Sequence, residues 1–136
     1  MIITDDANLT RLLDTHRDIA MVGLSARADR PSNSVARYLL ARGYTVIPVN
    51  PAVSEILGQR CYANLHDIPV KVDMVDVFRK ADDVPPIADA AIAIGAKSLW
   101  LQLGIINETA AQKASAAGLD VVMDRCPKIE YARLFG

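Results

Sequence analysis

The sequence predicts a doubly wound α/β domain, in which a five-stranded, mainly parallel sheet has helices on both faces. Short apolar segments alternate with segments of helical periodicity, and no linker, repeat or low-complexity tract interrupts them. The expected strands are apolar almost throughout, as strands covered on both faces are. Because 136 residues suffice for one core but hardly for two, we expect a single domain over residues 1–136.

The expected strands are short segments rich in branched and apolar residues. In chain order they run over residues 19–22, 45–49, 73–78, 98–102 and 119–123. The helices between them carry recognisable ends: Asp5 or Asp6 can cap the first, Gly43 and Gly118 suit helix C-termini, and Pro85 suits a first turn. The expected helices run over residues 7–17, 34–42, 85–93 and 107–117.

Composition limits the possible functions. The net charge of -1 indicates neither a nucleic-acid surface nor a disordered chain, and no apolar run approaches the ~20 residues of a membrane span. Two distant cysteines, Cys61 and Cys126, and two isolated histidines make no metal motif. With no signal-like N-terminus, a cytoplasmic protein is expected.

The first strand leads into a glycine turn and a helix. After residues 19–22 come Gly23-Leu24-Ser25 and then Arg30-Pro31-Ser32-Asn33-Ser34, followed by the helix expected from Val35. The free N–H groups and dipole of such a helix attract anions, and phosphate is the anion most often bound. The turn therefore predicts a nucleotide or a nucleotide-bearing cofactor.

A dinucleotide site fits this turn poorly. Ser25 stands where the dinucleotide fingerprint has its second glycine, and no third glycine follows. The second strand ends in Pro48-Val49-Asn50-Pro51, without the acidic residue that binds a ribose 2′-hydroxyl. Ligands of doubly wound sheets bind at the carboxyl ends of the strands. The segments at these ends are 23–34, 49–51, 78–80, 102–104 and 124–127.

The strand ends carry a set of ordered motifs: Gly23-Leu24-Ser25, Asp29-Arg30-Pro31-Ser32, Val46-Ile47-Pro48-Val49-Asn50-Pro51, Val75-Asp76-Val77-Phe78-Arg79, Leu99-Trp100-Leu101-Gln102-Leu103-Gly104 and Val122-Met123-Asp124-Arg125-Cys126. These motifs resemble the stand-alone CoA-binding proteins, which are similar to the N-terminal CoA-binding domain of the succinyl-CoA synthetase α subunit. The resemblance implies a Rossmann-like fold that holds CoA or acyl-CoA. It places the diphosphate over the first βα turn and the adenosine among neighbouring strand ends.

The sequence departs from the synthetase in two places. The synthetase needs a phosphorylated histidine in a second domain and a partner subunit, whereas this sequence contains only His16 and His66. The synthetase domain also has a CoA-binding lysine after its second strand, but residues 50–54 contain none. We therefore expect a binding, carrier or regulatory module rather than a complete synthetase. Whether it forms a homo-oligomer or has a protein partner stays open.

Each strand end offers groups suited to one part of CoA. Ser25 and Ser32, with the N–H groups of residues 32–34 and the charge of Arg30 or Arg27, can bind the diphosphate. Val49 and Pro51 can form an apolar ledge for the adenine, and Asn50 can bind the base or the ribose. Arg79 is a second candidate for a phosphate contact. Gln102 can offer polar groups to the pantetheine amides, and Gly104 can leave space for them.

Cys126 follows the last expected strand, beside Arg125. It is either a buried apolar side chain or a thiol that forms a mixed disulfide with CoA. The alternative functions are an NAD(P)-binding protein and a CoA-dependent acyltransferase that uses Cys126. The candidate coenzyme-binding residues are Gly23, Leu24, Ser25, Arg27, Arg30, Pro31, Ser32, Asn33, Ser34, Val49, Asn50, Pro51, Phe78, Arg79, Gln102, Gly104, Arg125 and Cys126.

Overall fold

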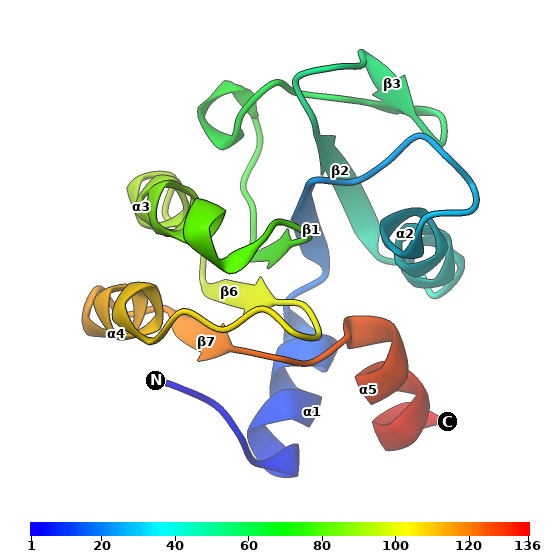
Figure 1. Ribbon diagram of the computed structural model, residues 1–136. Coiled ribbons are helices and arrows are strands. Elements are labelled where there is room, and N and C mark those ends of the chain that lie inside the picture. Colours follow the sequence, from blue (N-terminus) through cyan, green and yellow to red (C-terminus); the bar gives the residue numbers. More distant parts are fainter.

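The computed structural model describes residues 1–136 and contains the predicted parallel sheet (Figure 1). Its strands are β1 (Asp18–Val22), β2 (Thr45–Val49), β5 (Met74–Val77), β6 (Ser98–Leu101) and β7 (Asp120–Val122). They lie in the order β2-β1-β5-β6-β7, and every pair is parallel. The predicted α/β class is confirmed.

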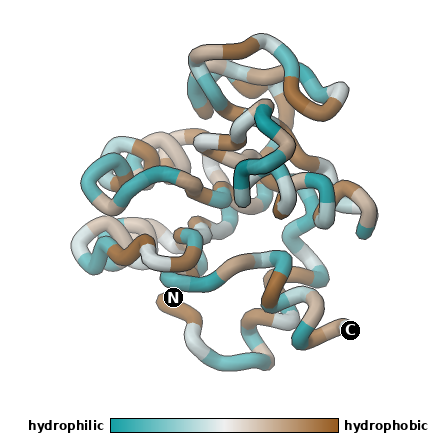
Figure 2. Tube along the Cα trace, turned by 45° about the vertical axis from the view of Figure 1, so that its right-hand side comes forward, coloured by the Kyte–Doolittle hydropathy of each residue, from teal (hydrophilic) through white to brown (hydrophobic).

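Five α-helices cover the two faces of the sheet. They are α1 (Asp6–Thr15), α2 (Pro31–Ala41), α3 (Val84–Ala93), α4 (Glu108–Ala116) and α5 (Pro127–Phe135). Buried side chains of α1, α2 and α5 share one core with one face, and those of α3 and α4 share a second core with the other. Hydrophilic and hydrophobic stretches alternate along the helices in Figure 2, as in helices that bury one side. None of them is both long and apolar enough to cross a membrane.

Helix α1 is capped at its start and packs on the sheet near Trp100. Asp5 is the cap of α1, since its carboxylate accepts a hydrogen bond from the Asn8 N–H at 3.2 Å. Leu9, Leu12 and Leu13 of α1 are buried, and so is His16 directly after the helix, whose Nδ1 lies 2.9 Å from Ser98 Oγ. Trp100 is fully buried in the core under α1, α2 and α5.

The second helix begins earlier than the sequence predicted. We expected it from residue 34, but α2 begins at Pro31, whose ring fixes a helical φ and needs no hydrogen-bond acceptor. Arg30 is the extended residue before it. Ser32 and Asn33 therefore lie in the first turn, where both are buried.

A helix, a short hairpin and two 3₁₀ helices were not predicted from the sequence. The helix is α5, which Pro127 opens. The hairpin is that of β3 (Glu55–Ile56) and β4 (Gln59–Arg60), whose turn residues Leu57 and Gly58 both have positive φ. The short 3₁₀ helices η1 (Leu65–Asp67) and η2 (Ala81–Asp83) complete the fold.

Single bridges cover both edges of the sheet. Ile2 pairs with Val121 beside β7, and the Ile3 N–H donates to the Val121 carbonyl at 2.8 Å. At the other edge Tyr62 pairs with Val49, and its N–H donates to the Pro48 carbonyl at 3.0 Å. Each edge strand therefore has part of its outer backbone groups paired within the chain.

A carboxylate lies inside the sheet core. Asp76 on β5 is fully buried between Met21 and Trp100, and neither carboxylate oxygen has a hydrogen-bond partner. Burial raises the pKa of Asp76 well above its ordinary value, because the charged form loses its hydration. The folded state thus holds this proton more tightly than the unfolded chain does.

Replacing Asp76 by Asn is expected to raise the free energy of unfolding at pH 7 by about 1–3 kcal/mol. An acid whose folded pKa is raised costs stability progressively as pH rises above its unfolded pKa. The gain of the variant over the natural protein should therefore widen from pH 5 to pH 8 in urea titrations.

Asp73 supplies the matched control for this titration. Although partial burial opposes it, the Asp18 N–H and Lys97, whose Nζ lies 3.4 Å away, lower the pKa of Asp73. Asp73→Asn should accordingly destabilise the protein at neutral pH. A gain for Asp76→Asn that stays constant with pH would contradict the assignment of a raised pKa.

Candidate functional site

The strand order reverses between β1 and β5, where ligand sites of doubly wound sheets form. Gly23, with φ +86°, follows β1, and its N–H donates to the Val49 carbonyl at 3.0 Å. A Cβ at Gly23 would lie 2.5 Å from the Phe78 carbonyl oxygen. This glycine is therefore required because two backbones approach each other closely, at the carboxyl ends of β1 and β5.

Side chains of α2 hold the loop that follows Gly23. The Ser25 N–H donates to Ser32 Oγ at 3.0 Å, and Asn33 Nδ2 donates to the Ser25 carbonyl at 2.9 Å. Arg37 Nε in turn donates to Asn33 Oδ1 at 2.9 Å. These bonds fix the loop against the helix, so it is ordered before any ligand binds.

Two helix N-termini with free donors lie near this loop. The N–H groups of Ser32 and Asn33 have no acceptor within the chain, and no side chain caps α2. Helix α5 begins in the same way, with Cys126 as an extended N-cap that makes no side-chain capping bond and Pro127 in the first turn. Both ends carry the positive end of a helix dipole.

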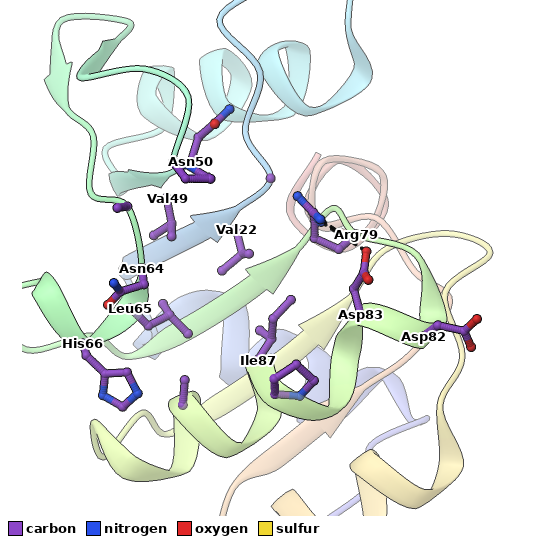
Figure 3. Close-up of a pocket in the computed structure, with 15 residues that line it drawn as sticks. Val22, Val49, Asn50, Asn64, Leu65, His66, Arg79, Asp82, Asp83 and Ile87 are labelled. Carbon is purple, nitrogen blue, oxygen red and sulfur yellow. Dashed lines mark hydrogen bonds and ion pairs between the residues drawn. The ribbon is translucent and has the colours of Figure 1, made fainter.

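One cavity, which we call the β2-side cavity, lies between the end of β2 and α3 and has a volume of about 460 Å³ (Figure 3). The residues that line it are Val22, Gly23, Val49, Asn50, Pro51, Ala63, Asn64, Leu65, His66, Arg79, Asp82, Asp83, Pro86, Ile87 and Ala90. Five predicted residues meet here, namely Gly23, Val49, Asn50, Pro51 and Arg79.

Polar groups of the β2-side cavity are partly engaged already. Asn50 Nδ2 donates to the Leu24 carbonyl at 3.0 Å, and its Oδ1 accepts from the Ala52 N–H at 2.8 Å. Arg79 Nη2 lies 3.3 Å from Asp83 Oδ2, and both side chains are partly exposed. Figure 3 shows Arg79 and Asn50 above an apolar base that includes Val22 and Ile87.

A second cavity, the α5-side cavity, has a volume of about 710 Å³. The residues that line it are Pro31, Ser34, Val35, Phe78, Arg79, Lys80, Gln102, Leu103, Ile105, Cys126, Lys128 and Ile129. They come from the first turns of α2 and α5 and from the ends of β5 and β6. The lining carries three cationic side chains and no carboxylate, so this cavity favours negative charge.

Two polar side chains of the α5-side cavity differ in their bonding. Gln102 is only 6% exposed, and its Oε1 has no hydrogen-bond partner. Lys128 Nζ donates to Ser34 Oγ at 3.1 Å and joins the starts of α5 and α2. Because a buried acceptor without a donor costs free energy, Gln102 suits a ligand that supplies an N–H or O–H group.

Arg79 is the one residue that lines both cavities. The α5-side cavity also brings together the predicted residues Pro31, Ser34, Phe78, Gln102 and Cys126. The arrangement can therefore hold an elongated ligand with an anionic middle, one end on each side of Arg79. No group of three metal-ligating side chains is present.

The remaining predicted residues line neither cavity. Leu24 belongs to the core, Ser25, Ser32 and Asn33 hold the loop, and Arg30 lies exposed before α2. Arg27 pairs with Asp29, Arg125 pairs with Glu130, and the Gly104 N–H donates to Asp124. Arg125 follows a strand as Arg79 does, but it lines neither cavity and pairs with Glu130 of α5.

Sequence reasoning missed several lining residues. Lys128 was overlooked because α5 was not predicted, although Pro127 is the kind of residue that opens a helix. His66 drew attention only as one of two isolated histidines, but it lines the β2-side cavity together with Leu65. No sequence signal marks Leu65 and His66 as lining residues, since only the folded chain brings η1 to the β2-side cavity.

The fold and its strand-end cavities define a Rossmann-like α/β protein of the ligand-binding class. Residues 17–132 match the CoA binding domain family, and the chain belongs to that family. The resemblance seen in the motifs is confirmed.

Known proteins similar to this chain include stand-alone and multidomain examples. Uncharacterized protein YneT of Bacillus subtilis is 37% identical over 126 residues, 93% of each chain. A hypothetical protein of Pyrococcus horikoshii has a solved structure with 41% identity and a TM-score of 0.95, covering 98% of this chain and 94% of its own. Acetate–CoA ligase [ADP-forming] II of Archaeoglobus fulgidus is 32% identical over 73 residues, 52% of this chain but 11% of the ligase.

Gly23→Ala is expected to destabilise the protein by about 1–3 kcal/mol more than Gly104→Ala. Both glycines have positive φ, +86° and +79°, so both variants share the backbone strain. Only at Gly23 does the new Cβ meet backbone, since nothing lies within 4 Å at Gly104. Chemical denaturation of the two variants measures the difference. Equal losses would show that the close approach to Phe78 contributes nothing.

Proposed function

We propose that the protein binds CoA or acyl-CoA as a non-catalytic binding, carrier or regulatory module, with the CoA diphosphate over the turn between β1 and α2. The observation that carries this proposal is the pair of cavities that meet at Arg79. CoA has a nucleoside at one end, an anionic diphosphate in the middle and a pantetheine arm at the other end. Its three parts match the order of the two cavities and the arginine.

The adenosine belongs in the β2-side cavity in this proposal. Val22, Val49 and Ile87 offer apolar surface to the base, and Pro51 adds a rigid edge. Asn64 and His66 at the wall can meet polar groups of the base or ribose. The volume of about 460 Å³ lies within the range of small-molecule sites.

The diphosphate belongs at the junction of the cavities. Arg79 lines both, and Pro31 and Ser34 place the first turn of α2 on the wall of the second. The N–H groups of Ser32 and Asn33 and the Ser25 hydroxyl are donors in the same segment. Arg30 directly precedes this turn and makes no side-chain capping bond, so its cation is available as well.

The pantetheine arm belongs in the α5-side cavity. Val35, Phe78 and Ile129 supply apolar walls, while Gln102 Oε1 awaits a donor such as a pantetheine amide N–H. No histidine or carboxylate lines this cavity, where the acyl end of the ligand would lie. Its titratable groups are Arg79, Lys80, Lys128 and Cys126, and the three cations suit an anionic ligand, which supports the binding role.

Arg79→Gln is expected to weaken CoA binding about 10- to 100-fold in isothermal titration calorimetry, because it removes a charge-assisted contact to the diphosphate. Arg27→Gln is the matched control, since Arg27 pairs with Asp29 outside both cavities and its loss should leave the affinity unchanged. Equal affinities for both variants would remove Arg79 from the site.

Titration of the unmodified protein with CoA, dephospho-CoA, acetyl-CoA and NAD tests the ligand itself. CoA and acetyl-CoA should bind. Weaker binding of dephospho-CoA than of CoA would show that the 3′-phosphate is recognised. Tight binding of NAD with no binding of CoA would overturn the proposal in favour of a dinucleotide-binding protein.

A further inference from the structure

We propose that Cys126 is a site of covalent CoA attachment, where the thiol exchanges with the disulfide form of CoA and retains one CoA as a mixed disulfide. The inference rests on the proposed function, because the pantetheine arm must bring its sulfur into the α5-side cavity. It adds a redox-dependent state to a binding protein.

The position of Cys126 is the first observation. It lines the α5-side cavity as a free thiol at the N-terminus of α5, a helix of nine residues. The residue is 6% exposed, so its remaining access is through the cavity rather than from open solvent. No hydrogen bond to the helix holds its side chain.

Gln102 is the second, independent observation. Its Oε1 is buried without a donor on the wall of the same cavity, at the end of the strand beside β5. Such an acceptor indicates a ligand that brings a hydrogen-bond donor into a largely apolar space, and a pantetheine arm has amide N–H groups beside aliphatic carbons. A simple inorganic anion would leave Gln102 unsatisfied.

The charges around the cavity favour the exchange chemistry. Thiol–disulfide exchange begins with a thiolate and releases a thiolate. Lys80, Lys128 and Arg79 line the cavity without any carboxylate, and the α5 dipole points its positive end at the same place. The CoA thiolate that leaves is therefore released among positive charges.

The step is balanced without a further reagent. The Cys126 thiolate attacks one sulfur of the CoA disulfide, the sulfur–sulfur bond of the disulfide breaks, and a bond forms between Cys126 Sγ and one CoA. The second CoA leaves as a thiolate, which takes up the proton that Cys126 lost to solvent. Cys126 is oxidised and the departing CoA is reduced.

Cys61 serves as the internal control. It is also free, but it lines neither cavity, and its Sγ donates to the Asn50 carbonyl at 3.4 Å. Burial raises the pKa of the Cys61 thiol, which keeps it protonated and unreactive. A non-specific reaction of thiols would not favour Cys126 over Cys61, which is buried to a similar extent, whereas a CoA-guided reaction selects Cys126.

Intact mass spectrometry of the full chain incubated with CoA disulfide tests the inference. The natural protein and Cys61→Ser should each gain one CoA, removable by dithiothreitol, and Cys126→Ser should gain none. Gln102→Leu should slow the reaction with CoA disulfide about tenfold and leave a slow reaction with glutathione disulfide unchanged. Absence of an adduct, equal labelling of both cysteines, or equal rates with the two disulfides would overturn it.

Calorimetry with reduced CoA on Cys126→Ser separates this inference from the proposed function. If reduced CoA binds but CoA disulfide leaves no adduct on the natural protein, covalent attachment is wrong and CoA binding stands. If reduced CoA does not bind either protein, the proposed function fails and the covalent site fails with it.

Discussion

The close approach of backbone at Gly23 and Phe78 is the constraint on which the site depends. It lets β1 and β5 lie side by side up to their carboxyl ends, at the point where β2 lies to one side and β6 to the other. Arg79 follows directly and so lies between the two cavities. A side chain at position 23 would separate the turn from the residue that joins both halves of the site.

Polar side chains that the sequence predicted to bind the coenzyme instead hold the loop after Gly23 in place. Ser32 and Asn33 use their side chains on the loop, and Arg37 holds Asn33 in turn. Their main-chain donors stay free. The side chains therefore order the loop, while the backbone N–H groups remain free to bind an anion.

The alternation of apolar strands and capped helices was enough to predict the sheet, since it reflects burial on both faces. It was not enough for the hairpin after β2, because Leu57 adopts positive φ without the asparagine or aspartate that usually signals such a turn. Likewise Arg79 and Arg125 look equivalent in sequence, each one or two residues past a strand. Each pairs with a carboxylate four or five residues further on, but Arg79 lines both cavities, whereas Arg125 lines neither and its partner Glu130 is buried.

The short bridges at Ile2 and Tyr62 have a consequence for how copies of this molecule can meet. Part of each margin of the sheet is already paired within the chain, which leaves fewer backbone groups for a strand of a neighbouring molecule. At Val49 the bridge to Tyr62 also reaches the wall of the β2-side cavity, so the segment that covers this edge helps to position the candidate site.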